Sequence, residues 1–370
     1  MRILYISHLH PPKNEPLKNL GGMQNVSLQM TKALNRREEV EIDSIILHSS
    51  WSYIGVKTTF FLISLLWRIP MKVKSVKPDV ILFSSMVTAG VLPFMVTKPK
   101  VPKVTINHGQ DVTLPVAIYQ WYLKFVFKYL DGVISVSSAT RNASILRGMD
   151  PEKGVVLPNG YEEKEHENLP EKEDALKILH ETYLNNHEGR KVLLTVGRQV
   201  KRKGHQWFIE NVIPKIESDF VYLIVGSGPE FENIKEARNH SEFKDRIVLT
   251  GKISKEMLSI CYSASDLFIM PNIPVPGDME GFGIVILEAN RAGVPAIASD
   301  LEGIKDVIKQ GVNGYRIEQG DATEFANKID DVLNNDLEAF SIRAKDYVIK
   351  TFNWNAVVEK YITYLRSIYE

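Results

Sequence analysis

The residues with the clearest chemical potential are two carboxylates, Glu280 and Glu288, at and just after the stretch Glu-Gly-Phe-Gly-Ile of residues 280–284. The two glycines precede the apolar start of a predicted helix, so this loop can present backbone amides to an anion or to hydroxyl groups. Eight helical residues turn through about 800°, roughly 80° beyond two full turns. We therefore expect Glu280 in the loop. Glu288, about one turn into the helix, either binds a diol such as that of ribose or is a solvated surface carboxylate.

A second group of side chains is cationic. Residues 197–204 hold four Lys and Arg residues between two glycines, directly after an apolar run that is typical of a strand. Charge runs usually cover a solvated surface, but the end of a buried strand favours a clamp for phosphate groups. Arg198 and Lys203 are the candidate phosphate ligands.

A third candidate is His108, which follows a predicted strand at residues 104–106 and precedes Gly109. Asp111 lies three residues further on, where its carboxylate could orient the imidazole ring. The same carboxylate could instead cap the start of the next helix. The sequence leaves both interpretations open.

Two glycine loops complete the set. Gly21 and Gly22 precede a predicted helix near Met23, where the backbone can approach an anion or simply turn. Gly226 begins a Gly-Ser-Gly-Pro stretch that resembles half of a dinucleotide fingerprint, but Phe231 occupies the place of the third glycine. We therefore expect no hydride-transfer cofactor, and we predict a tight turn near a nucleotide base at Gly226.

The elements that must position these loops alternate along the chain as short apolar runs and amphipathic stretches. Continuous Val- and Ile-rich runs are typical of parallel strands covered on both faces. They lie at residues 2–7, 42–47, 80–84, 104–106, 133–136, 192–196, 221–225, 246–249, 267–270 and 295–298. This alternation predicts an α/β protein with two Rossmann-like, doubly wound domains that face each other across a cleft. Ligands of such sheets bind at the carboxyl ends of the strands.

A polar, charged stretch at residues 161–172 predicts the domain junction. We expect an amino-terminal domain over residues 1–160 and a second domain over residues 161–350. A helix with an apolar stripe follows within residues 351–370.

Composition narrows the class further. Apolar residues make up 44% of the chain and charged residues 24%, which is ordinary for a globular protein. The one cysteine, Cys261, suits a reducing compartment and is expected to be buried rather than catalytic. We expect neither a signal peptide nor a membrane span.

Residues 1–160 carry 19 Lys and Arg against 10 Asp and Glu, a net +9, and the remainder carries −9. This asymmetry indicates either an anionic partner or drift of surface composition. Nucleic acid is a poor candidate, because no basic cluster is interleaved with aromatic residues.

Together these loops resemble those of the retaining glycosyltransferases of family 4, which have the GT-B fold. Glu280 and Glu288 match the E-x7-E motif of that family. The other features fall in the order of the family: the Gly22 loop, His108-Gly109, Pro158-Asn159-Gly160 and the pair Arg198 and Lys203. The resemblance covers nearly the whole chain and implies that the last helix crosses back to the first domain.

The resemblance implies roles for the matching residues. Arg198 and Lys203 hold the donor diphosphate with help from the Gly22 backbone, and Glu288 binds the ribose. The base lies near Gly226, Lys252 and Ile253. The transferred sugar is held by Glu280 and the amides of Gly281, Phe282, Gly283 and Ile284, with His108 beside its anomeric carbon. The implied catalytic residues are His108, Glu280, Arg198 and Lys203, with Asp111 as possible support.

The implied reaction moves a hexosyl group from a UDP- or GDP-linked sugar to a sugar or lipid-linked acceptor in surface polysaccharide or glycolipid synthesis. The nucleotide sugar is a substrate, so no cofactor is expected. Two fixed cations and a helix amino terminus can stabilise the leaving diphosphate, and no Asp-x-Asp motif occurs, so no metal is expected either. Paired carboxylates of the retaining-glycosidase kind are not apparent, and the resemblance implies front-face attack instead. A long, proline-rich segment at residues 272–279 leaves the donor sugar open.

Two other functions fit the same fold. One is a two-domain nucleotide-sugar epimerase, which would use the donor alone. The other is a non-catalytic partner subunit that binds only the nucleotide.

Two segments of the first half predict reversible contact with an anionic membrane at its cytoplasmic, inner face. Residues 60–77 combine an apolar helix ending at Trp67 with the cations Arg68, Lys72, Lys74 and Lys77. Residues 119–129 combine Trp121, Phe125 and Phe127 with Lys124 and Lys128. Each is too short to span a bilayer but could lie in the lipid interface. The alternative is that both are helices packed on the first sheet.

Overall fold

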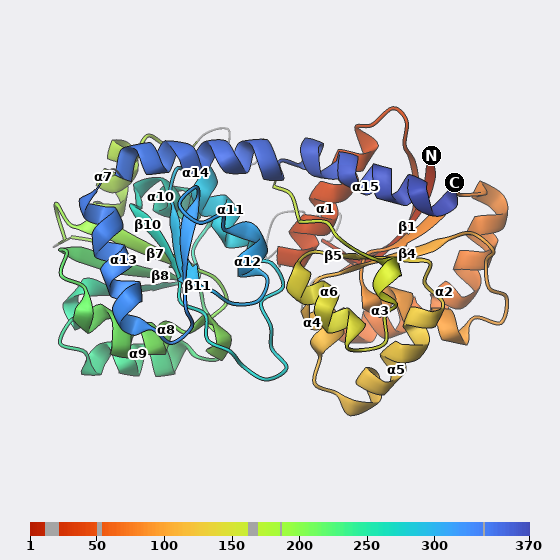
Figure 1. Cartoon of the computed structure of the whole chain (residues 1–370), viewed down its shortest axis with the longest axis horizontal. Coiled ribbons are helices and arrows are strands. Elements are labelled where there is room, and N and C mark those ends of the chain that lie inside the picture. The colour runs from red at the N-terminus through yellow and green to blue at the C-terminus, as the bar shows by residue number, and fades with distance from the viewer. Residues whose placement is uncertain (12–21, 50–53, 162–168, 186, 336) are drawn as a thin grey trace. The chain divides into compact units, whose positions relative to one another are not determined.

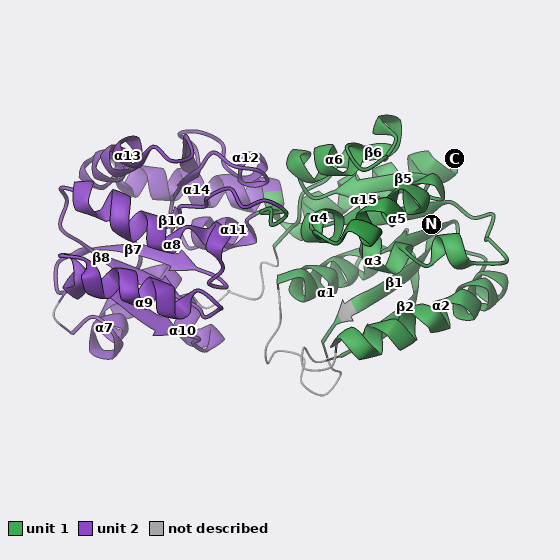
Figure 2. Cartoon of the chain, turned by 90° about the horizontal axis from the view of Figure 1, so that it is seen from below, with its two compact units in different colours: residues 1–162, 277–282, 352–370 green, residues 163–276, 283–351 purple. Residues whose placement is uncertain are grey.

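The computed structural model describes residues 1–11, 22–49, 54–161, 169–185, 187–335 and 337–370 (Figure 1). The chain forms two compact units (Figure 2). Unit 1 comprises residues 1–162, 277–282 and 352–370, and unit 2 comprises residues 163–276 and 283–351. The boundaries expected after residues 160 and 350 lie within two residues of the observed ones. No sequence pattern assigned residues 277–282 to unit 1.

Unit 1 is built on a parallel sheet with the strand order β2-β1-β3-β4-β5-β6. Its strands are β1 (Arg2–His10), β2 (Glu41–His48), β3 (Val80–Phe83), β4 (Lys103–Asn107), β5 (Gly132–Ser135) and β6 (Gly154–Val156). Its helices are α1 (Gly22–Asn35), α2 (Ile54–Val76), α3 (Met86–Ala89), α4 (Gln110–Thr113), α5 (Ala117–Lys128), α6 (Ser138–Ile145) and α15 (Trp354–Tyr369), with short turns η2 (Leu92–Phe94) and η3 (Pro151–Lys153).

Unit 2 is built on a second parallel sheet, in the order β12-β11-β10-β7-β8-β9. Its strands are β7 (Lys191–Val196), β8 (Phe220–Val225), β9 (Ile247–Gly251), β10 (Leu267–Met270), β11 (Ala296–Ser299) and β12 (Gly314–Ile317). Its helices are α7 (Lys172–Thr182), α8 (His205–Trp207), α9 (Phe231–His240), α10 (Lys255–Ala264), α11 (Ile284–Arg291), α12 (Ile304–Val307), α13 (Ala322–Asn334) and α14 (Leu337–Phe352), with short turns η5 (Lys201–Lys203), η6 (Phe208–Val212), η7 (Ile213–Lys215) and η8 (Lys244–Arg246). The predicted fold class, two parallel α/β domains, is confirmed.

The sequence predicts ten of these strands and misses β6 and β12. Both missed strands lie at the edge of a sheet and are only three and four residues long. All of β6 and the middle of β12 are half-buried, whereas the central strands β3, β5 and β8 are buried throughout. The edge strands β2 and β9 are also only partly buried but are longer, whereas β6 and β12 each contain only two large apolar residues, too few for the continuous apolar run that identifies a parallel strand.

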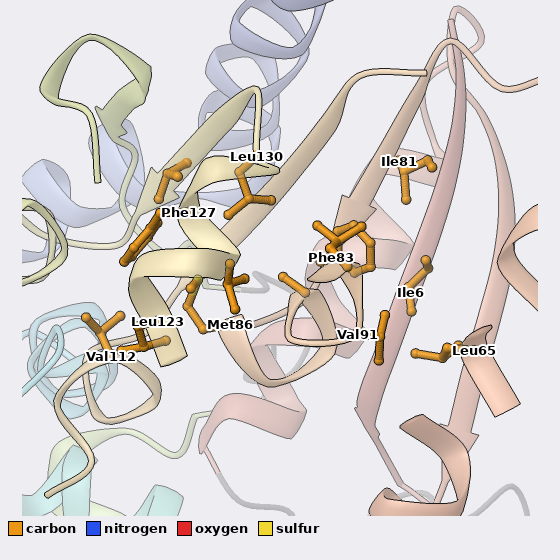
Figure 3. Close-up of a cluster of buried hydrophobic side chains, with 14 of the residues drawn as sticks. Ile6, Leu65, Ile81, Phe83, Met86, Val91, Val112, Leu123, Phe127 and Leu130 are labelled. Atoms are coloured by element: carbon orange, nitrogen blue, oxygen red, sulfur yellow. The ribbon is translucent and has the colours of Figure 1, made fainter. Parts of the chain in front are cut away.

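One core of unit 1 lies between its sheet and the helices α2, α3 and α5. Figure 3 shows Ile6 and Phe83 of the strands facing Leu65 of α2 and Met86 of α3, with Leu123 of α5 in the same cluster. Each such side chain contributes about 1.5–3 kcal/mol when fully buried. The inner faces of these helices are therefore fixed on the sheet, which also fixes the faces they turn outward.

The course of α2 differs from the expectation in one respect. The sequence predicts an end near Trp67, but the helix continues to Val76 with Pro70 inside it. Phe127, expected as part of a lipid-facing group, is buried in the core.

The last helix, α15, belongs to unit 1 and packs along α1 (Figure 1). Trp354 donates from Nε1 to Oε1 of Gln29 over 2.8 Å, inside the protein. A Cβ on Gly160 would lie 2.6 Å from the Trp354 ring, so the chain can pass this ring only as glycine. The amide of Tyr161 donates to the carbonyl of Phe352 over 2.9 Å. The Pro-Asn-Gly stretch is thus tied to the start of the last helix.

Candidate active site

The cationic loop of unit 2 follows β7 and contains the turn η5. Lys203 is buried, and its Cε lies 3.7 Å from the position of a Cβ on Gly197, so its side chain covers that glycine. Arg198 is exposed on the same loop. Gly204 adopts a left-handed conformation with φ 66°, and a side chain there would overlap the carbonyl oxygen of Pro271. Glycine is therefore required, and the loop lies tightly against the end of β10.

The loop after β8 packs directly on the cationic loop. A side chain on Gly226, whose φ is 132°, would overlap the carbonyl oxygen of Gly197. The amide of Gln199 donates to the carbonyl of Ser227 over 3.0 Å. The predicted turn at Gly226 thus lies beside the residues predicted to bind phosphate.

The segment after β9 joins the same edge of the sheet. The amide of Gly226 donates to the carbonyl of Gly251 over 2.9 Å. Lys252, which is exposed, and Ile253, which is half-buried, follow directly. The predicted base-lining residues therefore lie next to the Gly226 turn, as a nucleotide running along this edge would require.

Glu288 lies in the second turn of α11, and its Oε2 accepts a hydrogen bond of 2.8 Å from the Tyr262 hydroxyl. Tyr262 is buried, and burial together with the Glu288 carboxylate raises the pKa of its phenol well above the usual value. The phenol therefore stays protonated and keeps the carboxylate in one orientation. A carboxylate has about four acceptor sites, so Glu288 retains the capacity to bind a diol.

Glu280 lies in the loop before α11, as predicted, but that loop packs within unit 1. Met279 is buried in the core of unit 1. The Oδ1 atom of Asp278 accepts a hydrogen bond of 2.7 Å from Nε2 of Gln110. Glu280 itself is 9% exposed. The two glutamates of the motif are therefore carried by different units, with the change occurring after Phe282.

The Glu280 loop meets the His108 loop backbone to backbone. A side chain on Gly281 would overlap the carbonyl oxygen of His108, and a Cβ on Gly109 would lie 2.9 Å from Cα of Gly281. Gly109 has a φ of 106°, which also favours glycine. Two motifs far apart in the sequence are thereby brought into contact, with one glycine on each side.

The carboxylate of Asp111 binds backbone rather than the His108 ring, which corrects the ring-orienting interpretation. Its Oδ1 accepts from the His108 amide over 2.8 Å and its Oδ2 from the Met86 amide over 3.1 Å. Asp111 lies within α4, after the capping residue Gly109. Its role is to hold the loop that carries His108.

The His108 ring is oriented by a carbonyl group. Its Nε2 lies 2.9 Å from the carbonyl oxygen of Ser84. A carbonyl only accepts, so Nε2 donates, and a neutral ring then presents Nδ1 as an acceptor. This is the protonation pattern that lets the ring accept a hydrogen bond from a sugar hydroxyl.

The remaining predicted residues are placed as follows. Gly283 precedes α11 in a left-handed conformation with φ 82°, and Ile284 begins the helix. The Phe282 side chain is buried and lies 6.1 Å from the Phe352 ring, so only its backbone can serve a ligand. Gly22 is the exposed first residue of α1, whereas Gly21 lies outside the described residues. Cys261 is buried, and burial raises the pKa of its thiol to about 12.

Two residues of this region escape the sequence interpretation. Tyr262 holds Glu288, but it lies on another helix, and no local pattern indicates the contact. His8 is buried in β1, and burial together with nearby His108 lowers the pKa of its imidazole to about 4. Its place near the carboxyl end of a parallel strand could have marked it.

Two family models match this chain. The first, "Glycosyltransferase Family 4", matches residues 20–165, and the second, "Glycosyl transferases group 1", matches residues 180–351. Together they cover most of both units. The chain belongs to the family 4 glycosyltransferases. The predicted resemblance is thus confirmed at the level of the family.

Relatives of this family 4 chain include enzymes of surface polysaccharide synthesis. It is 23% identical over 272 residues to a putative colanic acid biosynthesis glycosyltransferase, WcaL, of Salmonella typhimurium, covering 71% of this chain and 64% of the relative. It is 27% identical over 254 residues to an Escherichia coli UDP-Gal:alpha-D-GlcNAc-diphosphoundecaprenol alpha-1,3-galactosyltransferase, covering 66% and 62%. The chain thus spans somewhat less than two thirds of the length of these two relatives.

Solved structures show the same GT-B fold. HepE of Anabaena in complex with UDP superposes with a TM-score of 0.73 at 18% identity, covering 99% of this chain and 100% of that one.

None of the described helices is both long and apolar enough to cross a membrane.

Proposed function

We propose that this family 4 protein is a retaining glycosyltransferase that moves a hexosyl group from a UDP- or GDP-linked sugar to an acceptor. The observation that carries the proposal is the contact between the Glu280-Gly281 loop and the His108-Gly109 loop. It joins, backbone to backbone, the loop that carries a buried carboxylate and the loop that carries an oriented imidazole, which a protein that bound only a nucleotide would not need.

The donor diphosphate is proposed to bind at the loop after β7. As the bond to the sugar breaks, negative charge grows on the diphosphate. Arg198 and Lys203 offer cations there, and the tight packing around Gly204 keeps the loop from relaxing. Fixed charges that need no reorganisation stabilise a transition state most effectively. The same two cations are the basis for proposing that no divalent metal is required.

The nucleoside is proposed to extend along the strand ends of unit 2. Glu288 binds the ribose diol, since the Tyr262 hydroxyl holds its carboxylate in one orientation. The base lies toward Gly226, Lys252 and Ile253. The complex of HepE with UDP is one precedent for a nucleotide on this fold.

The sugar is proposed to contact Glu280, the amides of residues 281–284 and Nδ1 of His108. Transfer with retention then follows a front-face course. The bond from C1 to the diphosphate oxygen breaks, the bond from C1 to the acceptor oxygen forms on the same face, and the acceptor proton passes to the departing phosphate.

The acceptor is proposed to be a lipid-linked sugar or glycan of a surface polysaccharide or glycolipid, met at the inner face of the cytoplasmic membrane. The name of the Escherichia coli relative specifies a diphosphoundecaprenol acceptor. The basic first half of the chain, at +9, suits an anionic surface.

The decisive experiment first identifies the donor from its thermal stabilisation of the chain, since a ligand at about 100 times its Kd stabilises by about 2.7 kcal/mol. The purified chain is then incubated with that donor and lipid-linked acceptors, with and without EDTA, and the anomer formed is read by NMR. We expect the anomeric configuration of the donor, unaffected by EDTA. An inverted product, or activity restored only by a divalent metal, would overturn the proposal.

Two controls separate the other functions. An isomerised donor without any acceptor product would indicate the epimerase. Nucleotide binding without turnover would indicate the non-catalytic subunit. Glu280→Gln should lower the transfer rate about 100-fold, the typical effect of one lost electrostatic contact in a transition state.

A further inference from the structure

Helix α2 is apolar on two opposite faces. Its inner face, Phe61, Leu65 and Ile69, is buried against the sheet of unit 1. Its outer face carries a stripe of exposed large apolar side chains at intervals of three or four residues: Val56, Phe60, Ile63, Trp67 and Met71, which are 65%, 71%, 49%, 52% and 60% exposed. That spacing places all five on one side of a helix. The next position along the stripe is Lys74, which is also exposed.

Helix α5 repeats this arrangement. Leu123, Val126 and Phe127 are buried in the same core as the inner face of α2. On the outer face Ile118 is 75% and Trp121 59% exposed. Trp121 contacts the ring of Phe125 at 4.7 Å between centroids, and the Nζ of Lys128 lies 5.6 Å from the Phe125 ring. Both stripes therefore pass from aromatic residues to a lysine toward the carboxyl end of the helix.

The two stripes belong to one layer of the molecule. α2 and α5 pack on the same core of unit 1, as Figure 3 shows for Leu65 and Leu123. The η2 turn lies beside α5, where the ring of Phe94 stacks on Tyr122 at 5.5 Å. Phe94 is 66% exposed and Val96 fully exposed. Exposed apolar side chains thus lie on α2, at and just after η2, and on α5, all in one layer of unit 1, and exposed apolar groups gathered on one layer in this way indicate a site of interaction.

The charges around these helices indicate which kind of partner covers the exposed apolar side chains. Residues 44–130 contain ten Lys and Arg but only two acids, Asp79 and Asp111. Both acids accept from backbone amides, Asp79 from that of Arg2 and Asp111 from those of His108 and Met86. Lys72 is paired with Asp43 at 2.7 Å, whereas Lys57, Lys74 and Lys124 are exposed. An apolar stripe bordered by cations with few acids suits an anionic lipid surface.

We propose that the outer faces of α2 and α5, with the η2 turn beside α5, form a platform that lies in the interface of an anionic membrane. Trp67 and Trp121 insert at the headgroup level, and Lys74 and Lys128 bind lipid phosphates. A second copy of this chain fits less well, because the same face would bring cations against cations. Membrane binding by this platform does not depend on the proposed function. Only its purpose does, which is to bring the active site to a lipid-borne acceptor.

The experiment measures cosedimentation of the intact chain with phosphatidylcholine vesicles, with or without about one third phosphatidylglycerol. The test variant is the double substitution Phe60→Ser and Trp67→Ser, which alters only exposed side chains. The matched control is Ile342→Ser, an apolar residue of unit 2 that is 59% exposed. A second variant, Lys74→Glu with Lys128→Glu, changes the two proposed phosphate ligands and tests the charge.

We expect binding to vesicles that contain phosphatidylglycerol, weakened about tenfold or more by either double variant and unchanged in Ile342→Ser. Quenching of tryptophan fluorescence by brominated lipid should fall in Trp67→Phe. No binding of the natural chain, or equal binding by all variants, would overturn the proposal. A dimer in size-exclusion chromatography that the Phe60/Trp67 variant dissociates would assign the face to a second copy instead. None of these measurements needs catalytic turnover. A chain that does not bind vesicles would therefore overturn the platform and leave the proposed reaction untouched. A chain that binds vesicles but transfers no sugar would overturn only the reaction.

Discussion

The two units of this family 4 chain share one architecture but differ in where their unusual residues lie. Both have a parallel sheet covered by helices. Of the fourteen large apolar side chains that are exposed in the described residues, only Ile178 and Ile342 belong to unit 2. Unit 2 instead concentrates left-handed glycines and cations in the loops at its strand ends, as at Gly204 and Gly226.

The difference shows that the fold supplies a scaffold and that the function depends on local features added to it. In unit 2 those features are strand-end loops, where backbone amides and cations can meet a diphosphate. In unit 1 they are the outer sides of two helices and the His108 loop. We therefore expect substitutions in the strand-end loops of unit 2 to affect donor use, and substitutions on the outer sides of α2 and α5 to affect membrane contact.

The largest effect is expected from Lys203→Ala. If Lys203 stabilises the leaving diphosphate as proposed, removing its charge should lower kcat by about 100- to 1,000-fold. Steady-state kinetics with the nucleotide sugar checks this, and vesicle binding should not change. Lys201→Ala, an exposed cation of the same turn, is the control and should change kcat less than about threefold. Equal losses in the two variants would contradict a specific role for Lys203.

A smaller effect is expected at Glu288, the proposed ribose ligand. Tyr262→Phe removes the 2.8 Å hydrogen bond that orients Glu288, and Glu288→Gln removes the charged acceptor itself. Donor Kd, measured by calorimetry, should rise about tenfold in Glu288→Gln and less in Tyr262→Phe, in line with about 1.5–3 kcal/mol for a hydrogen bond to a charged group. If donor affinity is unaffected in both variants, the ribose lies elsewhere.

The last effect concerns stability in acid rather than donor use. His205 of unit 2 is buried, and burial, with a contribution from Lys203, lowers the pKa of its imidazole to about 3. The unfolded chain binds this proton near pH 6.5, whereas the folded chain does not, so stability falls as the pH drops below about 6.5. Between pH 6.5 and pH 5 the free energy of unfolding therefore falls by about 2 kcal/mol, at 1.36 kcal/mol per pH unit.

His205→Leu removes this term. Its Tm relative to the natural chain should therefore rise as the pH is lowered from 7 to 5, as followed by calorimetry. His240→Gln, which changes an exposed histidine, is the control and should show no such trend. A constant Tm difference across the range would show that His205 does take up a proton in the folded chain.

Much of the fold could be predicted from the sequence because buried parallel strands leave continuous apolar runs. β10 has the predicted bounds, residues 267–270. β6 and β12 could not be found in this way, since each is very short and contains only two large apolar residues. The course of α2 through Pro70 was also missed, because its packing on the sheet outweighs the local effect of proline.

The site was predictable in its motifs but not in its assembly. Glu280, Glu288 and Lys203 stand out by residue type and position. That residues 277–282 pack in unit 1 depends on tertiary contacts such as Gln110 with Asp278, which no local pattern encodes. The same holds for Asp111, whose spacing from His108 suits a ring contact and a backbone cap equally well.

The most direct test asks whether donor chemistry and membrane contact depend on different surfaces, and it compares two acceptors in one variant. The rate of sugar transfer to a soluble acceptor and to the same acceptor embedded in anionic vesicles is measured for the natural chain and for Phe60→Ser with Trp67→Ser. We expect the rate on the vesicle-borne acceptor to fall about tenfold or more, with the rate on the soluble acceptor unchanged. Equal rates on both acceptors, or an equal loss on both, would contradict the assignment of donor chemistry and membrane contact to separate surfaces.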